Sequence, residues 1–396
     1  MKQRTQKTAT HSTAPVRERA YLVAVEPRGK HDGLGAEASL DELELLAFTA
    51  GADTAGRAVQ KLDSPNTATY IGKGKLEEII AEREGTEYTM VIFDDELSPS
   101  QQRNLENALK VKVLDRTALI LDIFARRAQT REARLQVELA QTQYLLPRLA
   151  GQWSHLERLE GRIGTRGPGE SQLVTDRTLV RNRITRLRRE IDDVSQQRAL
   201  YRRRRARQGM QVAALVGYTN AGKSTLMRAL SGAEVFTEDL LFATLDPVTR
   251  RIHLPSGHEM LLTDTVGFIQ KLPTQLVAAF RATLEELTEA DILVHLVDIT
   301  HEDAEEQYAT VERTIKELGL ENKPRVVAFN KIDLLTDAAG EPEARREIEA
   351  ALHADHPEAV LISAAKKWNL DGLLRAIERE LAEASKRAEA EAPVEA

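Results

Sequence analysis

The sequence predicts an α/β protein with three parts, and three observations support that prediction. Strand-like and helical stretches alternate over residues 20–125, which is typical of a parallel sheet covered by helices. A heptad pattern of apolar residues runs through a long helical stretch that ends near Arg207. The short apolar run 212–216 leads into the pattern Gly-x-x-x-x-Gly-Lys-Ser at 217–224. We therefore expect an N-terminal parallel α/β domain, an antiparallel helical hairpin and a C-terminal P-loop domain with helices on both faces of its sheet.

The N-terminal domain is expected to cover residues 19–127, after a disordered arm over residues 1–18. Apolar runs and turn signals predict strands at 20–25, 57–62, 90–93 and 111–114. Helices are expected at 39–50, from Gly72-Lys73-Gly74-Lys75 to about 84, after Ser98-Pro99, and from Thr117. Ser39 followed by Glu42 fits a capping box, and Pro99 fits the first position of a helix.

A hairpin of two helices is expected over residues 128–208. The first helix covers 130–146, with leucines roughly on one face, and the second covers 171–207. The glycine-rich loop 151–169 joins them, so the simplest arrangement is an antiparallel pair with this loop at its tip. In the second helix a coiled-coil seam with alternating spacings of four and three is predicted at Val180, Ile184, Leu187, Ile191 and Val194.

The remaining chain is expected to form a second α/β domain over residues 209–382. Strand-like runs occur at 212–216, 260–263, 291–297, 325–329 and 359–362, with helical stretches between them. The residues 383–396 are rich in Ala and Glu, and we expect an acidic tail that is either a fraying helix or disordered.

Composition limits the classes of protein to which the chain can belong. The chain has 396 residues and no cysteine, which excludes disulfides, thiolate metal sites and cysteine nucleophiles and fits a reducing compartment. No stretch approaches the roughly 18 apolar residues that cross a bilayer. The polar and basic residues Met1–Pro15 lack the apolar segment of a secretory signal. We therefore expect a soluble cytoplasmic protein.

The distribution of charge is more informative than its sum. The net charge is −7, but between Arg177 and Arg207 twelve arginines stand against three acidic residues. A phosphate surface responds to charges within about a Debye length, roughly 8–10 Å. This basic stretch therefore favours a nucleic-acid partner in spite of the acidic total.

The segment that begins at Gly217 fits a phosphate-binding loop. Backbone N–H groups at the start of the following helix hold phosphate oxygens in such loops. Lys223 is expected to lie across the β- and γ-phosphates, and the Ser224 hydroxyl is expected to coordinate Mg²⁺. The alternative is a chance match in a glycine loop, against which the strand–loop–helix context argues. The nucleotide-binding residues expected here are Gly217, Tyr218, Thr219, Asn220, Ala221, Gly222, Lys223, Ser224 and Thr225.

Two later segments fit the switches of a GTPase. Thr244 is a candidate for the switch-one threonine that completes the Mg²⁺ shell, and Asp264 would hold the ion through water. The Gly267 backbone N–H would contact the γ-phosphate, whose loss releases both segments. The expected nucleotide-binding residues are Phe242, Ala243, Thr244, Asp264, Thr265, Val266 and Gly267. The expected catalytic residues are Lys223, Thr244 and Gly267, and the expected metal ligands are Ser224, Thr244 and Asp264.

A third group of residues predicts guanine specificity. Guanine presents N1–H and a 2-amino group side by side, and the Asp333 carboxylate can accept both. Adenine lacks this pair of donors, so a buried Asp333 would remain unpaired with ATP. The residues expected to contact the base are Asn330, Lys331, Ile332, Asp333, Ser363, Ala364 and Ala365. Each motif alone could be an ordinary loop, but five motifs in order at strand ends predict a GTPase.

The residue after Gly267 is Phe268, where Ras-like enzymes have a glutamine that orients the attacking water. Phenylalanine cannot orient water, so we expect slow intrinsic hydrolysis that a partner accelerates. The alternative is that Phe268 packs in the core and another residue positions the water.

With these residues placed, the chain resembles the HflX family of translation-factor-class GTPases over about residues 20–380. The motifs that carry the resemblance are Gly72-Lys73-Gly74-Lys75, Gly164-Thr165-Arg166-Gly167-Pro168-Gly169-Glu170 with Gln172-Leu173 and Asp176-Arg177, and Asp264-Thr265-Val266-Gly267-Phe268-Ile269. Ser171 and Val174 depart from the family pattern, which usually has Thr and Glu at these positions.

The resemblance implies binding to the large ribosomal subunit, splitting of stalled or idle 70S ribosomes, and a role in recovery from heat stress. It also implies that the hairpin tip approaches the peptidyl-transferase centre, and that the family hydrolyses GTP and can bind ATP. ATP binding by the N-terminal region through Gly72-Lys73-Gly74-Lys75 is one interpretation, and a ribosomal contact or a structural role is the favoured one. We expect a monomer.

The arginines of the hairpin support an RNA partner independently, because they suit phosphate contacts on shaped RNA. The alternatives are a solvated helix face or a charged linker. The residues expected to bind RNA are Arg162, Arg166, Arg181, Arg186, Arg188, Arg189, Arg202, Arg203, Arg204 and Arg205. Other functions left open are a ribosome-bound assembly or silencing factor, in which hydrolysis only times release, and a signalling GTPase whose hairpin binds a protein.

Overall fold

The structure is a computed structural model that describes residues 17–29, 35–152, 168–207, 210–232, 241–272, 286–339, 350–354 and 356–391. Within these ranges no helix has the length and apolar character needed to cross a membrane. The predicted arm over residues 1–18 lies mostly outside the described residues, as does most of the predicted tip loop, including Arg162 and Arg166.

The N-terminal domain is built on a four-stranded parallel sheet in the order β2-β1-β3-β4, as the alternation of strands and helices predicted. Successive side chains of β1 pack on opposite faces. Leu22 joins an apolar cluster with α1 and α5, while Tyr21 and Val23 join a second cluster with α2 and α4. The elements are β1 (Glu18–Pro27), α1 (Ala36–Thr49), β2 (Ala52–Leu62), α2 (Lys73–Ala81), α3 (Arg83–Thr86), β3 (Met90–Phe93), α4 (Pro99–Leu109), β4 (Lys112–Asp115) and α5 (Arg116–Arg127).

One predicted helix cap is confirmed and the other is wrong. Ser98 caps α4 in a capping box with Gln101, and Pro99 is the first residue of the helix. Helix α1, however, begins at Ala36 after Gly35, so that Ser39 and the buried Glu42 lie inside it. Ser39 Oγ instead donates a hydrogen bond of 2.7 Å to Asp94 Oδ2. The spacing of Ser39 and Glu42 resembles a capping box in the sequence, but both side chains make tertiary contacts instead.

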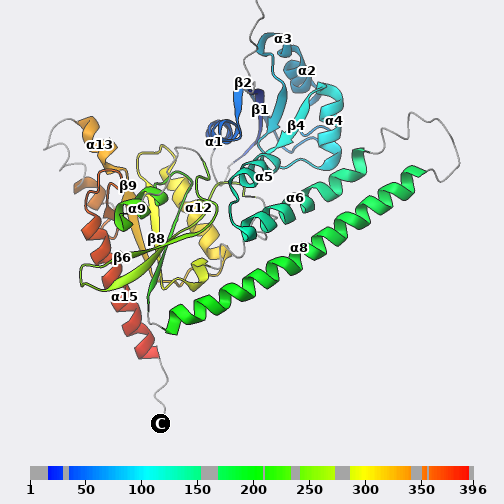
Figure 1. The fold of residues 1–396 in the computed structure, drawn as a ribbon. Coiled ribbons are helices and arrows are strands. Elements are labelled where there is room, and N and C mark those ends of the chain that lie inside the picture. Colours follow the sequence, from blue (N-terminus) through cyan, green and yellow to red (C-terminus); the bar gives the residue numbers. More distant parts are fainter. Residues whose placement is uncertain are drawn as a thin grey trace, which may run out of the picture.

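The two helices of the hairpin, α6 (Arg131–Gln152) and α8 (Pro168–Arg207), run antiparallel to each other (Figure 1). The predicted heptad seam is confirmed. Leu187 and Ile184 of α8 are buried against Leu135 and Leu139 of α6, and the seam continues on both helices through Leu146, Val180, Ile191 and Val194.

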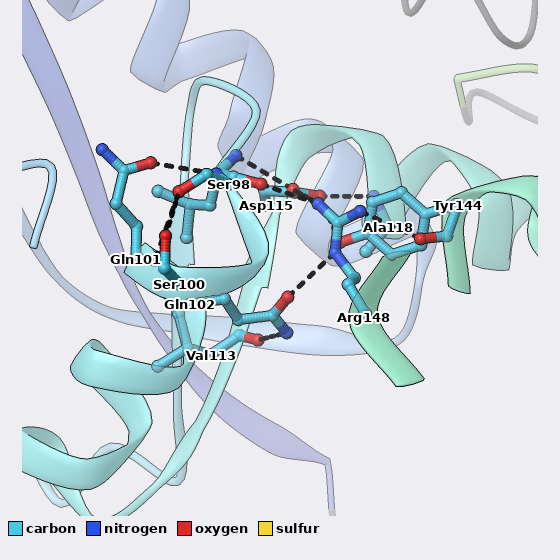
Figure 2. A network of polar contacts seen from close by, with 10 residues as sticks. Ser98, Ser100, Gln101, Gln102, Val113, Asp115, Ala118, Tyr144 and Arg148 are labelled. Carbon is cyan, nitrogen blue, oxygen red and sulfur yellow. Dashed lines mark hydrogen bonds and ion pairs between the residues drawn. The ribbon is translucent and has the colours of Figure 1, made fainter. Parts of the chain in front are cut away.

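Helix α6 is also bound to the N-terminal domain through Arg148 (Figure 2). The Arg148 guanidinium donates to Leu97 O at 2.7 Å and to Asp115 Oδ2 at 3.1 Å. Tyr144 Oη donates to the other carboxylate oxygen of Asp115 at 2.9 Å, and the guanidinium carbon lies 3.5 Å from the centroid of the Tyr144 ring. These contacts satisfy a largely buried cation, so the first half of the hairpin is anchored on the N-terminal sheet.

The C-terminal domain is a six-stranded sheet in the order β10-β9-β8-β5-β7-β6, and helices cover both faces as predicted. Among the described strands of this sheet, the edge strand β6 is the antiparallel one. The elements are β5 (Val212–Gly217), α9 (Lys223–Ser231), β6 (Val248–His253), β7 (Glu259–Asp264), β8 (Ile292–Asp298), α12 (Ala304–Glu317), β9 (Arg325–Asn330), α13 (Ile332–Ala339), β10 (Val360–Leu361) and α15 (Leu370–Glu391). Helix α15 continues to Glu391, through part of the stretch where a tail was expected.

Strand β6 was not predicted. Its residues Val248–His253 include Thr249, Arg250 and Arg251, which give it little apolar character. It is an edge strand with one pairing partner, β7, so most of its side chains remain exposed or half-buried. The strand propensity of the residues predicts such a strand poorly, because pairing with the neighbouring strand stabilises it.

The seam of the hairpin gives a direct test of the packing. Leu187 is fully buried in the seam, whereas Leu179 on the same helix is 60% exposed. We expect Leu187→Ala to lower the free energy of unfolding by about 2–4 kcal/mol, because it leaves a cavity. We expect Leu179→Ala to change it by less than about 0.5 kcal/mol. Urea denaturation followed by circular dichroism measures both, and equal effects would contradict the antiparallel seam.

Candidate nucleotide-binding site

The predicted motifs meet at one edge of the C-terminal sheet. Strands β5, β7, β8 and β9 are parallel, so their carboxyl ends lie together, which is where ligands bind in open α/β sheets. Gly217 ends β5, Asp264 ends β7 and Asn330 ends β9. Part of the predicted site lines a cavity of about 340 Å³, whereas Asp264, Asn330 and Asp333 are not among its lining residues. The residues that line it are Thr219, Asn220, Gly222, Lys223, Ser224, Thr225, Phe242, Ala243, Thr244, Thr265, Gly267 and Ala365, together with Arg228, which was not predicted.

The loop 217–222 requires glycine at both ends. Gly217 has φ +151° and Gly222 has φ +98°, conformations that residues with a Cβ rarely adopt. A Cβ at Gly217 would collide with the carbonyl oxygen of Leu296, and one at Gly222 would collide with the Asn330 side chain. Helix α9 begins immediately after Gly222, so its first N–H groups, which have no partner within the helix, face the cavity edge.

Lys223 is buried beside the glycine of the predicted second switch. Its Nζ donates to the carbonyl oxygens of Tyr218 at 2.7 Å and Gly217 at 3.1 Å. Burial lowers the pKa of Lys223 to about 8, against the opposing effect of Asp264. A Cβ on Gly267 would lie 2.9 Å from Lys223 Nζ and 2.9 Å from Thr219 Cα. Because that space is taken, the second switch can approach the P-loop this closely only with glycine.

The three predicted metal ligands converge. Ser224 Oγ lies 2.6 Å from Asp264 Oδ2 and 2.8 Å from Thr244 Oγ1, and Thr244 Oγ1 lies 3.1 Å from the same carboxylate oxygen. Burial raises the pKa of the Asp264 carboxyl, and the Ser224 hydroxyl and Lys223 oppose this shift. The other oxygen, Oδ1, is buried and has no hydrogen-bond partner among the described residues. One carboxylate and two hydroxyls fit Mg²⁺, which prefers oxygen ligands and takes the rest from water and phosphate.

Among the predicted base-binding residues, the Asn330 side chain connects two loops of the site. Asn330 Nδ2 donates to Ala221 O at 2.8 Å, and Asn330 Oδ1 accepts from Ala364 N at 2.9 Å. Asn330 therefore links the P-loop to the loop 363–365. Asp333 lies in the first turn of α13 and is buried, while Lys331 pairs with Asp298 at 2.6 Å.

Phe268 is buried, in agreement with the packing interpretation. Its backbone N–H donates to Gly217 O at 3.1 Å, and its carbonyl accepts from Thr219 N at 2.8 Å. The side chain is therefore turned into the core while the backbone pairs with the P-loop. No polar group of Phe268 is available to orient water.

The predicted RNA-binding arginines lie on α8, apart from the two tip residues outside the described part. Arg181, Arg186, Arg188 and Arg189 are exposed. Arg186 forms a 2.7 Å ion pair with Glu190 one turn later. The residues Arg202, Arg203, Arg204 and Arg205 fall in the last turns of the same helix.

The motif Gly72-Lys73-Gly74-Lys75 opens α2, as predicted. Lys75 pairs with Glu78 at 2.8 Å, and Lys73 lies 3.7 Å from Glu77. Gly72 N donates to Gln60 Oε1 at 2.8 Å. Both lysines thus face carboxylates of their own helix, which favours the structural interpretation of this motif.

The fold and these contacts define a P-loop GTPase. Three family descriptions match the chain in order: "GTP-binding GTPase N-terminal" over residues 37–125, "GTP-binding GTPase Middle Region" over 127–205 and "50S ribosome-binding GTPase" over 212–331. The chain belongs to the HflX GTPase family and hydrolyses GTP.

Individual relatives show the extent of the similarity. GTPase HflX of Caldanaerobacter subterraneus is 50% identical over 92% of this chain and 81% of its own length. GTPase HflX of Alkalihalophilus pseudofirmus is 53% identical over 76% of this chain and 71% of its own length. A crystal structure of a GTP-binding protein from Sulfolobus solfataricus with GDP is 25% identical, covers 92% of this chain and 99% of that one, and has a TM-score of 0.45.

The buried Asp333 gives a test of base recognition. Asp333→Asn removes the carboxylate that pairs with the two guanine donors, so we expect GTP affinity to fall by at least about 100-fold. The affinity for ATP, which lacks this pair of donors, should stay the same. Titration of fluorescent GTP and ATP analogues measures both. Asp122→Asn, which breaks an exposed ion pair with Arg126, is the control and should leave both affinities unchanged.

Proposed function

We propose that this GTPase binds the large ribosomal subunit in the cytoplasm and uses GTP to separate the subunits of stalled or idle 70S ribosomes, including during recovery from heat stress. Ribosome binding stimulates its hydrolysis, which is slow in the free protein because Phe268 cannot orient water. Membership of the HflX family supports this proposal, and so does the "50S ribosome-binding GTPase" description that matches residues 212–331.

The observation that carries the proposal is the basic face of α8. Arg181, Arg188 and Arg189 are exposed within two turns of one another, and a run of four arginines follows in the same helix. The apolar seam with α6 lies on another face of the helix, and Arg181, Arg188 and Arg189 remain exposed beside it. A rigid helix that presents cations in this way suits the phosphates of folded RNA, which position a protein without sequence readout.

At the nucleotide site, each predicted residue takes the role expected from its motif. Lys223 contacts the β- and γ-phosphates, and the Gly267 N–H contacts the γ-phosphate. Ser224, Thr244 and Asp264 would hold Mg²⁺, which when bound would neutralise charge that develops on the phosphates. Asp333 pairs with guanine, and Asn330 keeps the P-loop and the loop 363–365 in register.

A contact between the first switch and the hairpin base supports coupling between nucleotide and ribosome. Asp246, two residues after Thr244, accepts from Gln129 N at 2.8 Å and from Thr130 N at 3.2 Å, and Thr130 Oγ1 also donates to it. Thr130 Oγ1 in turn accepts from Ala133 N at 3.1 Å, at the start of α6. A movement of Thr244 on loss of the γ-phosphate would therefore pull on the first helix of the hairpin.

Sucrose gradients of 70S ribosomes test the activity. We expect the chain to split ribosomes with GTP or a non-hydrolysable analogue, but not with GDP. Co-migration with the large subunit without splitting would instead indicate an assembly or silencing factor, in which hydrolysis only times release.

The proposed RNA contact is tested by measuring the affinity for large ribosomal subunits at several salt concentrations. Arg188→Glu with Arg189→Glu should weaken binding and lower the slope of log affinity against log salt by about one for each lost phosphate contact. The matched control is Arg313→Glu with Lys316→Glu on α12, which changes the net charge equally at two exposed positions and should have no such effect. Equal losses in the two double variants would contradict a docking face on α8.

The coupling contact gives a further prediction. Thr130→Val removes the hydroxyl that joins α6 to Asp246, so we expect ribosome-stimulated hydrolysis to fall about fivefold or more. Hydrolysis without ribosomes should not change. Thr142→Val is the control, because it removes a hydroxyl within α6 that donates to Glu138 O of the same helix. Normal stimulation in Thr130→Val would exclude this path of coupling.

A further inference from the structure

A polar cluster joins the N-terminal domain to the P-loop and the second switch; it is buried at Glu42, Asp94, Arg116 and Tyr218 and exposed at Lys271. From the N-terminal domain, it contains Ser39 and Glu42 on α1, Asp94 and Asp95 after β3, and Arg116 at the start of α5. From the C-terminal domain, it contains Tyr218 of the P-loop and the residues Gln270 and Lys271. The carboxyl edge of the N-terminal sheet thus faces the edge of the other sheet that binds nucleotide.

Tyr218 is the connection to the P-loop. Its hydroxyl donates to Glu42 Oε2 and accepts from Gln270 N at 2.8 Å. Glu42 is held from the other side by Arg116, whose Nη1 lies 2.6 Å from Asp94 Oδ1. One phenol oxygen therefore joins the P-loop, the backbone of the second switch and the N-terminal domain.

Lys271 is the second connection, and it completes the charge of the cluster. Its Nζ lies 2.5 Å from Asp94 Oδ2 and 2.6 Å from Asp95 Oδ1. Without it, the N-terminal residues of the cluster carry three carboxylates and one guanidinium, and Asp94 is buried. A buried carboxylate needs such a partner. Lys271 also has φ +54°, a strained conformation for a residue with a Cβ, which this pair of ionic contacts holds in place.

The two connections enclose the catalytic end of the second switch. Gly267 packs against Lys223 and Thr219, the Phe268 backbone pairs with the P-loop, and Gln270 and Lys271 are held by the cluster. The position of the Gly267 N–H is therefore determined from both sides. Because the Phe268 side chain is buried and its backbone pairs with the P-loop, the Gly267 N–H is the group of these two residues that would face a γ-phosphate.

We propose that Tyr218 and Lys271 are positioning residues for GTP hydrolysis, through which Glu42, Asp94 and Asp95 of the N-terminal domain hold the second switch in its reactive arrangement. Neither side chain touches the reacting atoms. Each acts through the backbone of residues 267–271, where a displacement of about 1 Å can cost 100-fold in rate. The inference concerns the GTPase itself and does not depend on the proposed action at the ribosome.

Single-turnover hydrolysis by the full-length protein without ribosomes tests the proposal. We expect Tyr218→Phe and Lys271→Met each to lower the rate of hydrolysis about tenfold, with affinities for GTP and GDP within about twofold of the original. Lys271→Arg keeps the charge and should restore most of the rate. The control Arg251→Met breaks an exposed ion pair with Glu259 in the same domain and should have no effect.

A second measurement separates positioning from folding. Asp95→Asn removes a partner of Lys271, so adding it to Lys271→Met should lower the rate no further. The thermal midpoint of each variant is measured alongside. Unchanged or faster hydrolysis in Tyr218→Phe and Lys271→Met would overturn the proposal, as would a loss of nucleotide affinity equal to the loss of rate. These outcomes leave the ribosomal proposal intact, because no ribosome is present.

Discussion

Arg116 is buried between the carboxylates of Glu42 and Asp94, and these two carboxylates are also the partners of Tyr218 and Lys271 of the C-terminal domain. Burial lowers the pKa of Arg116 to about 10, so the guanidinium remains charged at neutral pH. The cluster retains excess negative charge until Lys271 of the C-terminal domain approaches Asp94. Since an unpaired buried charge costs far more than a paired one, the arrangement that brings Lys271 to Asp94 is favoured over those that separate them.

Helix α5 connects this cluster to the hairpin. Arg116 at its start belongs to the cluster that holds the second switch. Phe124, two turns later, packs edge-on against Phe242 beside the first switch, with 4.6 Å between ring centroids. Just beyond the end of α5, Thr130 meets Asp246 and α6 begins. A single helix therefore contacts the surroundings of both switches and leads directly into the hairpin, and one apolar cluster runs through both domains beside it.

Local sequence patterns were enough to predict the hairpin seam and the meeting of the P-loop, Asp264 and Asn330 at one edge of the sheet. The P-loop, Asp264 and Asn330 occur in short contiguous motifs at strand ends, and the seam of α8 has a regular spacing. The contacts between domains could not be predicted in this way. Glu42 and Tyr218 form a hydrogen bond although they are 176 positions apart in the sequence. The residues next to either one give no indication of the other. Ser39 and Glu42 even matched a capping box, because the spacing of that motif is also one helical turn.

The use of charged groups in this interface has a physical reason. Replacing a buried ionic cluster by apolar side chains often leaves stability unchanged or raises it, so stability alone does not explain Arg116 and its partners. Apolar side chains can slide and repack, whereas bonds such as the 2.5 Å contact of Lys271 with Asp94 restrict the geometry of the interface. A switch whose phenylalanine cannot orient water depends on the geometry of its backbone. Directional bonds restrict a backbone, and here Glu42, Asp94 and Asp95 of the N-terminal domain supply them through Tyr218 and Lys271.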